Sequence, residues 1–338
     1  MEMVEEEVLT ALRPKPRDGF IKTGMVEKIT DRAKSYLLAG YPVHFSGAAG
    51  TGKTTLALHL AASLERPVIL IHGDDEFVSS DLVGGNQGYH RSRLVDNYIH
   101  SVLKTEDDVR KQWVDNRLTT ACRNGMTLIY DEFTRSKPEA NNVLLSVLEE
   151  RVLDLPHGSG DSYLQVHPDF RAIFTSNPEE YVGVHKTQDA LLDRMITIHL
   201  GHYDLRTEVA VTMARSGLDE EQARRIVRLV REIRQLGVRN YKPNIRACIM
   251  IARMTKMKGA RAAADDPVFS NICKDVLNME TIKVTHEGKT LVPEKVEEYI
   301  QKTCGAPLAP GGNGGNGRRS RASVGTAPRA GKEVKERV

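Results

Sequence analysis

Residues 47–54 of the sequence read GAAGTGKT, a turn with three glycines that ends in a lysine and a threonine. The preceding residues YPVHFSG (41–47) form a short apolar run typical of a strand, and KTTLALHLAASL (53–64) has the periodicity of a helix. A glycine-rich turn between a strand and a helix presents backbone N–H groups that can surround phosphate oxygens. This feature predicts an α/β fold with a phosphate-binding loop, the P-loop, at the end of a strand.

We expect the whole turn to contact a nucleotide, through Gly47, Ala48, Ala49, Gly50, Thr51, Gly52, Lys53, Thr54 and Thr55. The Lys53 ammonium is expected to reach the β- and γ-phosphates, and the Thr54 hydroxyl to ligate Mg²⁺. The alternative is a glycine-rich turn that happens to carry a lysine, and the strand and helix on either side disfavour it.

A second candidate site follows the apolar run TLIYDE (127–132), which ends in Asp131 and Glu132. Ligands of open α/β sheets bind at the carboxyl ends of the strands, where this run places both carboxylates. Asp131 is expected to hold Mg²⁺ beside Thr54, and Glu132 to act as the general base toward the attacking water. The alternative is a solvated Asp-Glu pair that opens a helix.

The run RAIFTSN (171–177) predicts another buried strand, which ends in Asn177. This side chain is expected to orient the attacking water and to contact the γ-phosphate. A lone asparagine before Pro178 would more often be a turn former, but its position one strand after Asp131 favours the functional interpretation.

Strands alternate with helices through the first two thirds of the chain, which indicates a parallel sheet covered on both faces. Further elements are expected as a strand at 67–73 and helices at 25–39, 108–123 and 138–150, followed by helices alone at 205–216, 219–236, 243–257 and 267–279. The prediction is therefore a three-layer α/β P-loop domain followed by a small all-helical lid. Its expected divisions are a flexible leader (1–17), the α/β domain (18–203), the lid (204–304) and a disordered tail (305–338).

Composition excludes several classes of protein. No apolar stretch approaches the roughly 18 residues of a membrane span, and the acidic start MEMVEEEVL is unlike a secretory signal. The four cysteines lie far apart without a CxxC pair, so we expect reduced thiols in a cytoplasmic protein and no metal framework. The segment 305–338 carries seven Lys or Arg and two Glu, a net +5, so the rest of the chain is at −2 for a total of +3. With aromatic residues at only 5%, nucleic acid is an unlikely partner.

The P-loop together with the Asp-Glu strand resembles the AAA+ ATPases, and more narrowly their MoxR branch. HGDDEFVSSDLVGG (72–85) is similar to that branch's helical insert, and EERVLDLPHGSGDSYLQVHPDFRAIFTSNP (149–178) to its hairpin before the sensor strand. LLDRM (191–195) and NIRACIMIAR (244–253) resemble its arginine-finger motif and second-sensor helix. The resemblance implies that Arg194 is an arginine finger acting in trans on ATP of a neighbouring subunit, that Arg246 is the catalytic residue of the second sensor, and that the active form is a ring, most simply a hexamer.

Longer runs, among them GYPVHFSGAAGTGKTTLALHLA and YDEFTRSKPEANNVLLSVLEERVLDLP, resemble a family of gas vesicle ATPases. This resemblance implies ATP-driven remodelling of gas vesicle structural or accessory proteins in the cytoplasm, at or near the vesicle surface. Alternatives are a MoxR-type chaperone for metal or cofactor insertion, a nucleic-acid motor, and a nucleotide-gated scaffold with little turnover. Arg194 and Arg246 could also be surface arginines, and Arg135 and Arg151 are lower-ranked candidates for the finger.

Overall fold

The computed structural model describes residues 11–12, 20–96, 104–155, 162–178, 189–236, 243–277, 285–286, 289–290 and 293–305. Most of the expected leader (1–17) and nearly all of the expected tail (305–338) therefore lie outside the described residues. From the leader, Leu12 pairs in an antiparallel bridge with Val68, with N–H···O distances of 2.7 Å in both directions. Among the described residues, no helix is long and apolar enough to cross a membrane.

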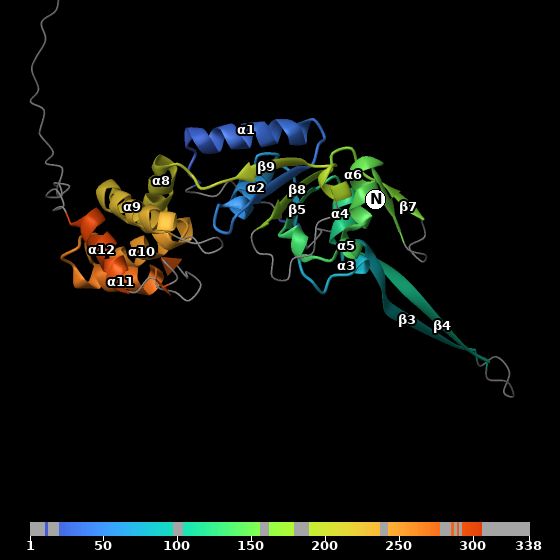
Figure 1. Ribbon diagram of the computed structural model, residues 1–338. Coiled ribbons are helices and arrows are strands. Elements are labelled where there is room, and N and C mark those ends of the chain that lie inside the picture. Colours follow the sequence, from blue (N-terminus) through green and yellow to red (C-terminus); the bar gives the residue numbers. More distant parts are fainter. Residues whose placement is uncertain are drawn as a thin grey trace, which may run out of the picture. The chain divides into compact units, whose positions relative to one another are not determined.

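A five-stranded parallel sheet forms the centre of the α/β part (Figure 1). Its strands are β1 (Val43–Gly47), β2 (Val68–His72), β5 (Thr127–Asp131), β8 (Arg171–Ser176) and β9 (Ile196–Leu200), in the order β2-β5-β8-β1-β9. Every neighbouring pair is parallel, so the carboxyl ends of all five strands meet at one edge. The predicted fold class, an α/β domain with a parallel sheet, is confirmed.

Successive residues of the buried strand β5 face opposite layers, as the pleat requires. Ile129 packs in a core with α1 (Gly24–Leu38) and α2 (Lys53–Ala62), whereas Leu128 and Tyr130 pack in a second core on the other face. The second core includes residues of α3 (Ser79–Val83), α4 (Arg117–Arg123) and α6 (Val143–Glu149). Two helical layers thus enclose the sheet, which keeps it dry and leaves its carboxyl edge for a ligand.

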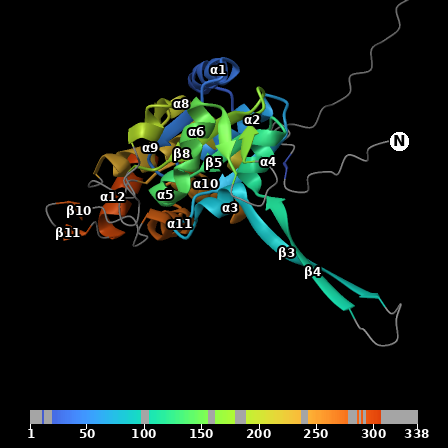
Figure 2. The same ribbon diagram turned by 90° about the vertical axis from the view of Figure 1, so that its right-hand side faces the viewer.

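Two hairpins interrupt this pattern. Strands β3 (Gly84–Asp96) and β4 (Lys104–Asp115) form a long antiparallel ribbon between α3 and α4 (Figure 2). The expected helix over 108–123 is therefore wrong in its first part, because residues up to Asp115 pair with β3 and the helix begins only at Arg117. The shorter hairpin, β6 (Val152–Asp154) with β7 (Tyr163–Gln165), precedes β8 where the family resemblance implied one.

Short helical elements follow the site strands: a 3-10 turn (Phe133–Arg135), α5 (Pro138–Asn141) and, before β9, α7 (Asp189–Leu192). The last part of the described chain is helical, with α8 (Leu205–Ser216), α9 (Glu220–Leu236), α10 (Ile245–Met257), α11 (Pro267–Leu277) and α12 (Pro293–Cys304). The two-residue strands β10 (Thr285–His286) and β11 (Lys289–Thr290) pair antiparallel between α11 and α12. These helices share an apolar core of their own, to which α9 contributes Ile226, Val230 and Ile233 at helical spacing.

Candidate nucleotide site

The P-loop leaves β1 and enters α2 through a tight turn. Gly52, directly before α2, has φ 84°, a left-handed conformation that a glycine adopts at no steric cost. Lys53 is the first residue of the helix, and its ammonium donates to the carbonyl oxygens of Gly47 at 2.7 Å and Ala48 at 2.9 Å. The side chain is thus folded back over the loop, above the N–H groups of the helix N-terminus, where an anion is stabilised.

Thr54 and Asp131 meet at the carboxyl edge of the sheet. The Thr54 hydroxyl lies 2.7 and 2.9 Å from the two carboxylate oxygens of Asp131, and the Thr175 hydroxyl donates to the same carboxylate at 2.5 Å. Asp131 is buried, with 6% of its surface exposed. A hydroxyl beside a carboxylate, both oxygen ligands, is a donor set that suits Mg²⁺.

Glu132 adopts a left-handed conformation, φ 53°, directly after the end of β5. Its backbone N–H donates to the Thr175 hydroxyl at 2.9 Å, so Thr175 contacts both acidic residues. The Glu132 carboxylate lines the pocket described below and pairs with the Arg135 guanidinium at 3.1 Å. This hydrogen bond raises the pKa of Arg135.

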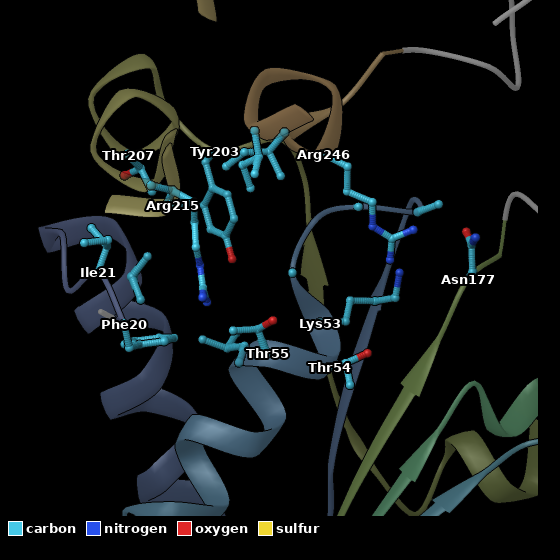
Figure 3. A pocket seen from close by; sticks show the side chains of 18 of the residues that line it. Phe20, Ile21, Lys53, Thr54, Thr55, Asn177, Tyr203, Thr207, Arg215 and Arg246 are labelled. Carbon is cyan, nitrogen blue, oxygen red and sulfur yellow. The ribbon is translucent and has the colours of Figure 1, made fainter. Parts of the chain in front are cut away.

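A pocket of about 240 Å³ opens in front of these residues. One end is polar and is lined by the P-loop, Asp131, Glu132, Asn177 and Arg246. Figure 3 draws the side chains of Lys53, Arg246 and Asn177 gathered there. The pocket is also lined by the apolar side chains of Phe20, Ile21, Val26, Ile245 and Ile249, by the phenol of Tyr203 and by Arg215. A pocket that combines a P-loop and charged side chains with apolar and aromatic ones fits a molecule that joins a polyphosphate to a flat ring.

The structure brings most, but not all, of the residues predicted for this site into one place. Asp131, Glu132, Asn177, Arg246 and most of the P-loop residues line a single pocket, although their roles stay predictions. Arg194 does not line it: its guanidinium pairs with the Glu149 carboxylate and donates to the carbonyl oxygen of Ala190 at 2.6 Å. Arg151 is also outside, because it bonds to the carbonyl oxygens of His167 and Pro168.

Sequence reasoning missed several residues of the pocket. Phe20 and Tyr203 lie near the limits of the expected α/β domain, and Arg215 is at the end of α8. Burial raises the pKa of Tyr203, so its phenol keeps its proton. No local motif marks these positions, because they reach the pocket only through the tertiary fold.

His44 lies behind the site, on β1. Its ring nitrogens lie 2.8 Å from the Ser176 hydroxyl and 3.0 Å from the Thr197 hydroxyl, which joins β1 to β8 and β9. Burial, together with His199 and Lys53, lowers its pKa to about 4. The ring is therefore neutral at pH 7, and it is a structural link next to Asn177 rather than an acid–base group.

Comparisons with known proteins agree with the geometry. Residues 42–195 match the model of the AAA domain (dynein-related subfamily). A solved RuvB mutant of Thermotoga maritima shares the fold, with a TM-score of 0.50 at 19% identity over 82% of this chain and 76% of that chain. The fold and the site thus define an AAA+ ATPase, an enzyme that hydrolyses ATP.

More specific relatives are gas vesicle proteins. The gas vesicle ATPase GvpN of Ancylobacter aquaticus is 54% identical over 79% of this chain and 75% of its own length. GvpN of Haloferax mediterranei is 48% identical over 76% of this chain and 74% of its own. The chain belongs to the GvpN family of gas vesicle ATPases. A more distant relative is Protein NorQ of Paracoccus denitrificans, 27% identical over 64% of this chain and 73% of that protein.

Proposed function

We propose that the pocket binds ATP with Mg²⁺, and that the chain works as one subunit of a ring, most simply a hexamer. The observation that carries the proposal is the arrangement of Lys53 and Arg246, whose charged ends lie on the same side of the pocket (Figure 3). Both residues line the pocket together with the P-loop, whose backbone N–H groups can surround phosphate oxygens, so a polyphosphate would meet charged and backbone donors there.

In this proposal each polar residue has a separate task. Thr54 and Asp131 would hold Mg²⁺, Asp131 through water, and the ion would supply positive charge next to the phosphate oxygens. Glu132 accepts the proton of the attacking water, and Asn177 holds that water in line with the γ-phosphate. Arg246 binds phosphate oxygens from the first turn of α10, within the proposed lid (204–304), so nucleotide binding would connect the lid to the α/β domain (18–203).

Arg194 is proposed to act on the nucleotide of a neighbouring subunit. Its position outside the pocket of its own chain agrees with a role in trans. Stabilisation of phosphoryl charge by such an arginine requires a second copy of the chain, which is the reason for the proposed ring.

The work done with ATP is proposed to be remodelling of a protein partner during the assembly or enlargement of gas vesicles, in the cytoplasm and at the vesicle surface. The support is the name of the relatives that are 45–54% identical. A second candidate is a chaperone for metal or cofactor insertion, the function that the resemblance to MoxR-type ATPases implies.

The test is steady-state phosphate release, with and without isolated gas vesicle shells, by the unmodified chain, Glu132→Gln and Glu150→Gln. Glu150 is exposed at the end of α6 and serves as the matched control. We expect Glu132→Gln to lose about 10²–10⁴-fold in rate, Glu150→Gln to lose nothing, and shells to stimulate turnover. If Glu132→Gln releases phosphate at the unmodified rate, the proposed mechanism is contradicted. If shells do not change the rate, the proposed gas vesicle partner is contradicted. If the unmodified chain releases no phosphate in either condition, a nucleotide-gated scaffold is favoured.

A further inference from the structure

The helix that carries Arg246 also touches the P-loop. Asn244, the residue before α10, donates from Nδ2 to the carbonyl oxygen of Ala49 at 3.1 Å. Its Oδ1 accepts from the backbone N–H of Arg246 at 2.9 Å, which is the capping contact of α10. One side chain therefore holds a P-loop carbonyl and the start of the Arg246 helix at the same time.

Asn244 also packs tightly against the loop. A Cβ added at Gly50 would lie 2.4 Å from Cγ and Nδ2 of Asn244, closer than van der Waals contact allows. Gly50 has φ 77° as well, so both its backbone conformation and its neighbour favour glycine. The contact is thus a close fit between the turn and the asparagine, with no room for a side chain at Gly50.

The position of Asn244 is fixed from the helical core. Arg234 on α9 donates from Nε to the carbonyl oxygen of Pro243 at 2.7 Å, and its Nη2 pairs with Oε1 of Glu208 at 2.8 Å. The side chains of Arg234 and Glu208 are only 8% and 1% exposed. Because Pro243 has a restricted φ and a bonded carbonyl, the backbone in front of Asn244 has little freedom.

The bond to Ala49 has a consequence on the other side of the same peptide. A peptide unit is planar, with its C=O and N–H pointing in opposite directions. A donor that holds the Ala49 carbonyl therefore also sets the direction of the Gly50 N–H. Gly50 lines the pocket, and its N–H is one of the P-loop donors available to phosphate.

We propose that Asn244 is a positioning residue of the nucleotide site: it sets the Ala49–Gly50 peptide for phosphate binding and ties that peptide to the helix of Arg246. The inference rests on the proposed nucleotide site and names a residue on which its affinity depends. Asn244 acts through the backbone of the P-loop and through Arg246, and it takes no part in the chemical step.

The test separates the capping contact from the P-loop contact by three substitutions. In Asn244→Ser the side chain can still cap α10 but is too short to reach the carbonyl oxygen of Ala49. In Asn244→Asp the side chain can also cap α10 but has no N–H to donate to that carbonyl. Asn244→Ala can make neither the capping contact nor the contact to Ala49. Asn116→Ser is the control, because Asn116 is the N-cap of α4, its Oδ1 accepts from the Arg117 N–H at 2.9 Å, and it does not line the pocket. A fluorescent ATP analogue measures affinity, competition by adenosine measures the base end alone, and thermal unfolding measures stability.

We expect Asn244→Ser to unfold at the temperature of the unmodified chain but to bind the ATP analogue about two- to tenfold more weakly, as the loss of one neutral hydrogen bond gives. Asn244→Asp should bind more weakly still, because its carboxylate faces a carbonyl, and adenosine should bind all variants equally. Asn244→Ala should lose both affinity and stability, and Asn116→Ser neither.

Unchanged analogue affinity in Asn244→Ser and Asn244→Asp would overturn the proposal, as would an equal loss for adenosine. Lys53→Ala in the same titration tells this failure from a failure of the nucleotide site. If Lys53→Ala abolishes binding of the ATP analogue and the Asn244 variants do not weaken it, the nucleotide site is supported and the proposed role of Asn244 is contradicted. If Lys53→Ala binds the analogue normally, both the nucleotide site and the role of Asn244 are contradicted.

Discussion

The Thr54 hydroxyl donates to the carboxylate of Asp131, lying 2.7 Å from one of its oxygens and 2.9 Å from the other. The contact joins the first turn of α2 to the last residue of β5, although the two residues are 77 positions apart in the sequence. Both groups are oxygen ligands, and Thr175 holds the carboxylate in place from β8. This pair is the proposed Mg²⁺ site.

Asp131→Asn should weaken the effect of Mg²⁺ on nucleotide binding, because higher concentrations of the ion are then needed. The amide keeps the size of the side chain but not its charge, and loss of such a supporting carboxylate typically costs about 10–100-fold in metal affinity. The measurement is titration of a fluorescent ATP analogue with Mg²⁺ or with EDTA. Equal Mg²⁺ dependence in Asp131→Asn and the unmodified chain would contradict the assignment of Asp131 as a metal residue.

Arg194→Ala should retain nucleotide affinity and lose turnover, by as much as about 10³–10⁵-fold where an arginine of this kind has been measured. The reason is that Arg194 lies outside its own pocket and is proposed to act on a neighbouring subunit. Arg224→Ala is the control, since Arg224 also pairs with a glutamate, Glu220, on α9. Phosphate release and nucleotide titration on the same preparations check the prediction, and normal turnover in Arg194→Ala would rule out the finger.

His44→Gln should reduce the loss of folding stability that occurs as the pH decreases from 6.5 to 4. The pKa of His44 is about 4 in the folded protein and 6.5 for the free side chain, so between these values only the unfolded chain takes up the proton. Stability is therefore fully present above pH 6.5 and falls as pH decreases, by about 3 kcal/mol at pH 4. Gln keeps a donor and an acceptor for Ser176 and Thr197 but cannot take up this proton.

Urea unfolding from pH 8 to pH 4 measures this difference. His199→Gln is the control, because the exposed His199 is one of several causes of the shift and its loss should leave most of the acid dependence. An identical acid dependence in His44→Gln and the unmodified chain would show that other groups are responsible.

Glu208→Gln should destabilise the helical part by about 3–5 kcal/mol, the cost of breaking a buried ion pair from one side. Glu208 is 1% exposed and pairs with both Arg231 and Arg234, so its loss leaves two guanidinium groups without their carboxylate. Glu220→Gln, in an exposed pair on α9, should cost no more than about 1 kcal/mol. Chemical unfolding compares the two, and equal effects would contradict the importance of burial.

Much of the site could be predicted from local sequence, for a physical reason. The P-loop, Asp131, Glu132 and Asn177 each follow a short apolar run, and parallel strands bring their carboxyl ends to one edge. Once the runs are recognised as parallel strands, these residues meet without further information. Their order along the sheet does not follow from the pattern, because it depends on how distant strands pair.

What escaped prediction depends on contacts between distant residues. Strand β4 has a helical pattern in its own sequence, and only its pairing with β3 makes it a strand. The short run of β9 carries a weak pattern, yet it completes the sheet beside β1 and leads to Tyr203. Asn244 reads as an ordinary helix cap, whereas its bond to Ala49 spans 195 positions of sequence.

The strand order also has a consequence for biosynthesis. Strand β1 pairs with β8 and β9, and Val43 lies between Ile173 and Ile196. A chain made from its N-terminus at about 5–20 residues per second completes β9 roughly 8–30 s after β1. Strand β8 is made before β9, so the strand that leads into the P-loop gains its first sheet neighbour with β8 and its second only with β9. The strand is therefore paired on both sides late in translation, only after Leu200 has left the ribosome.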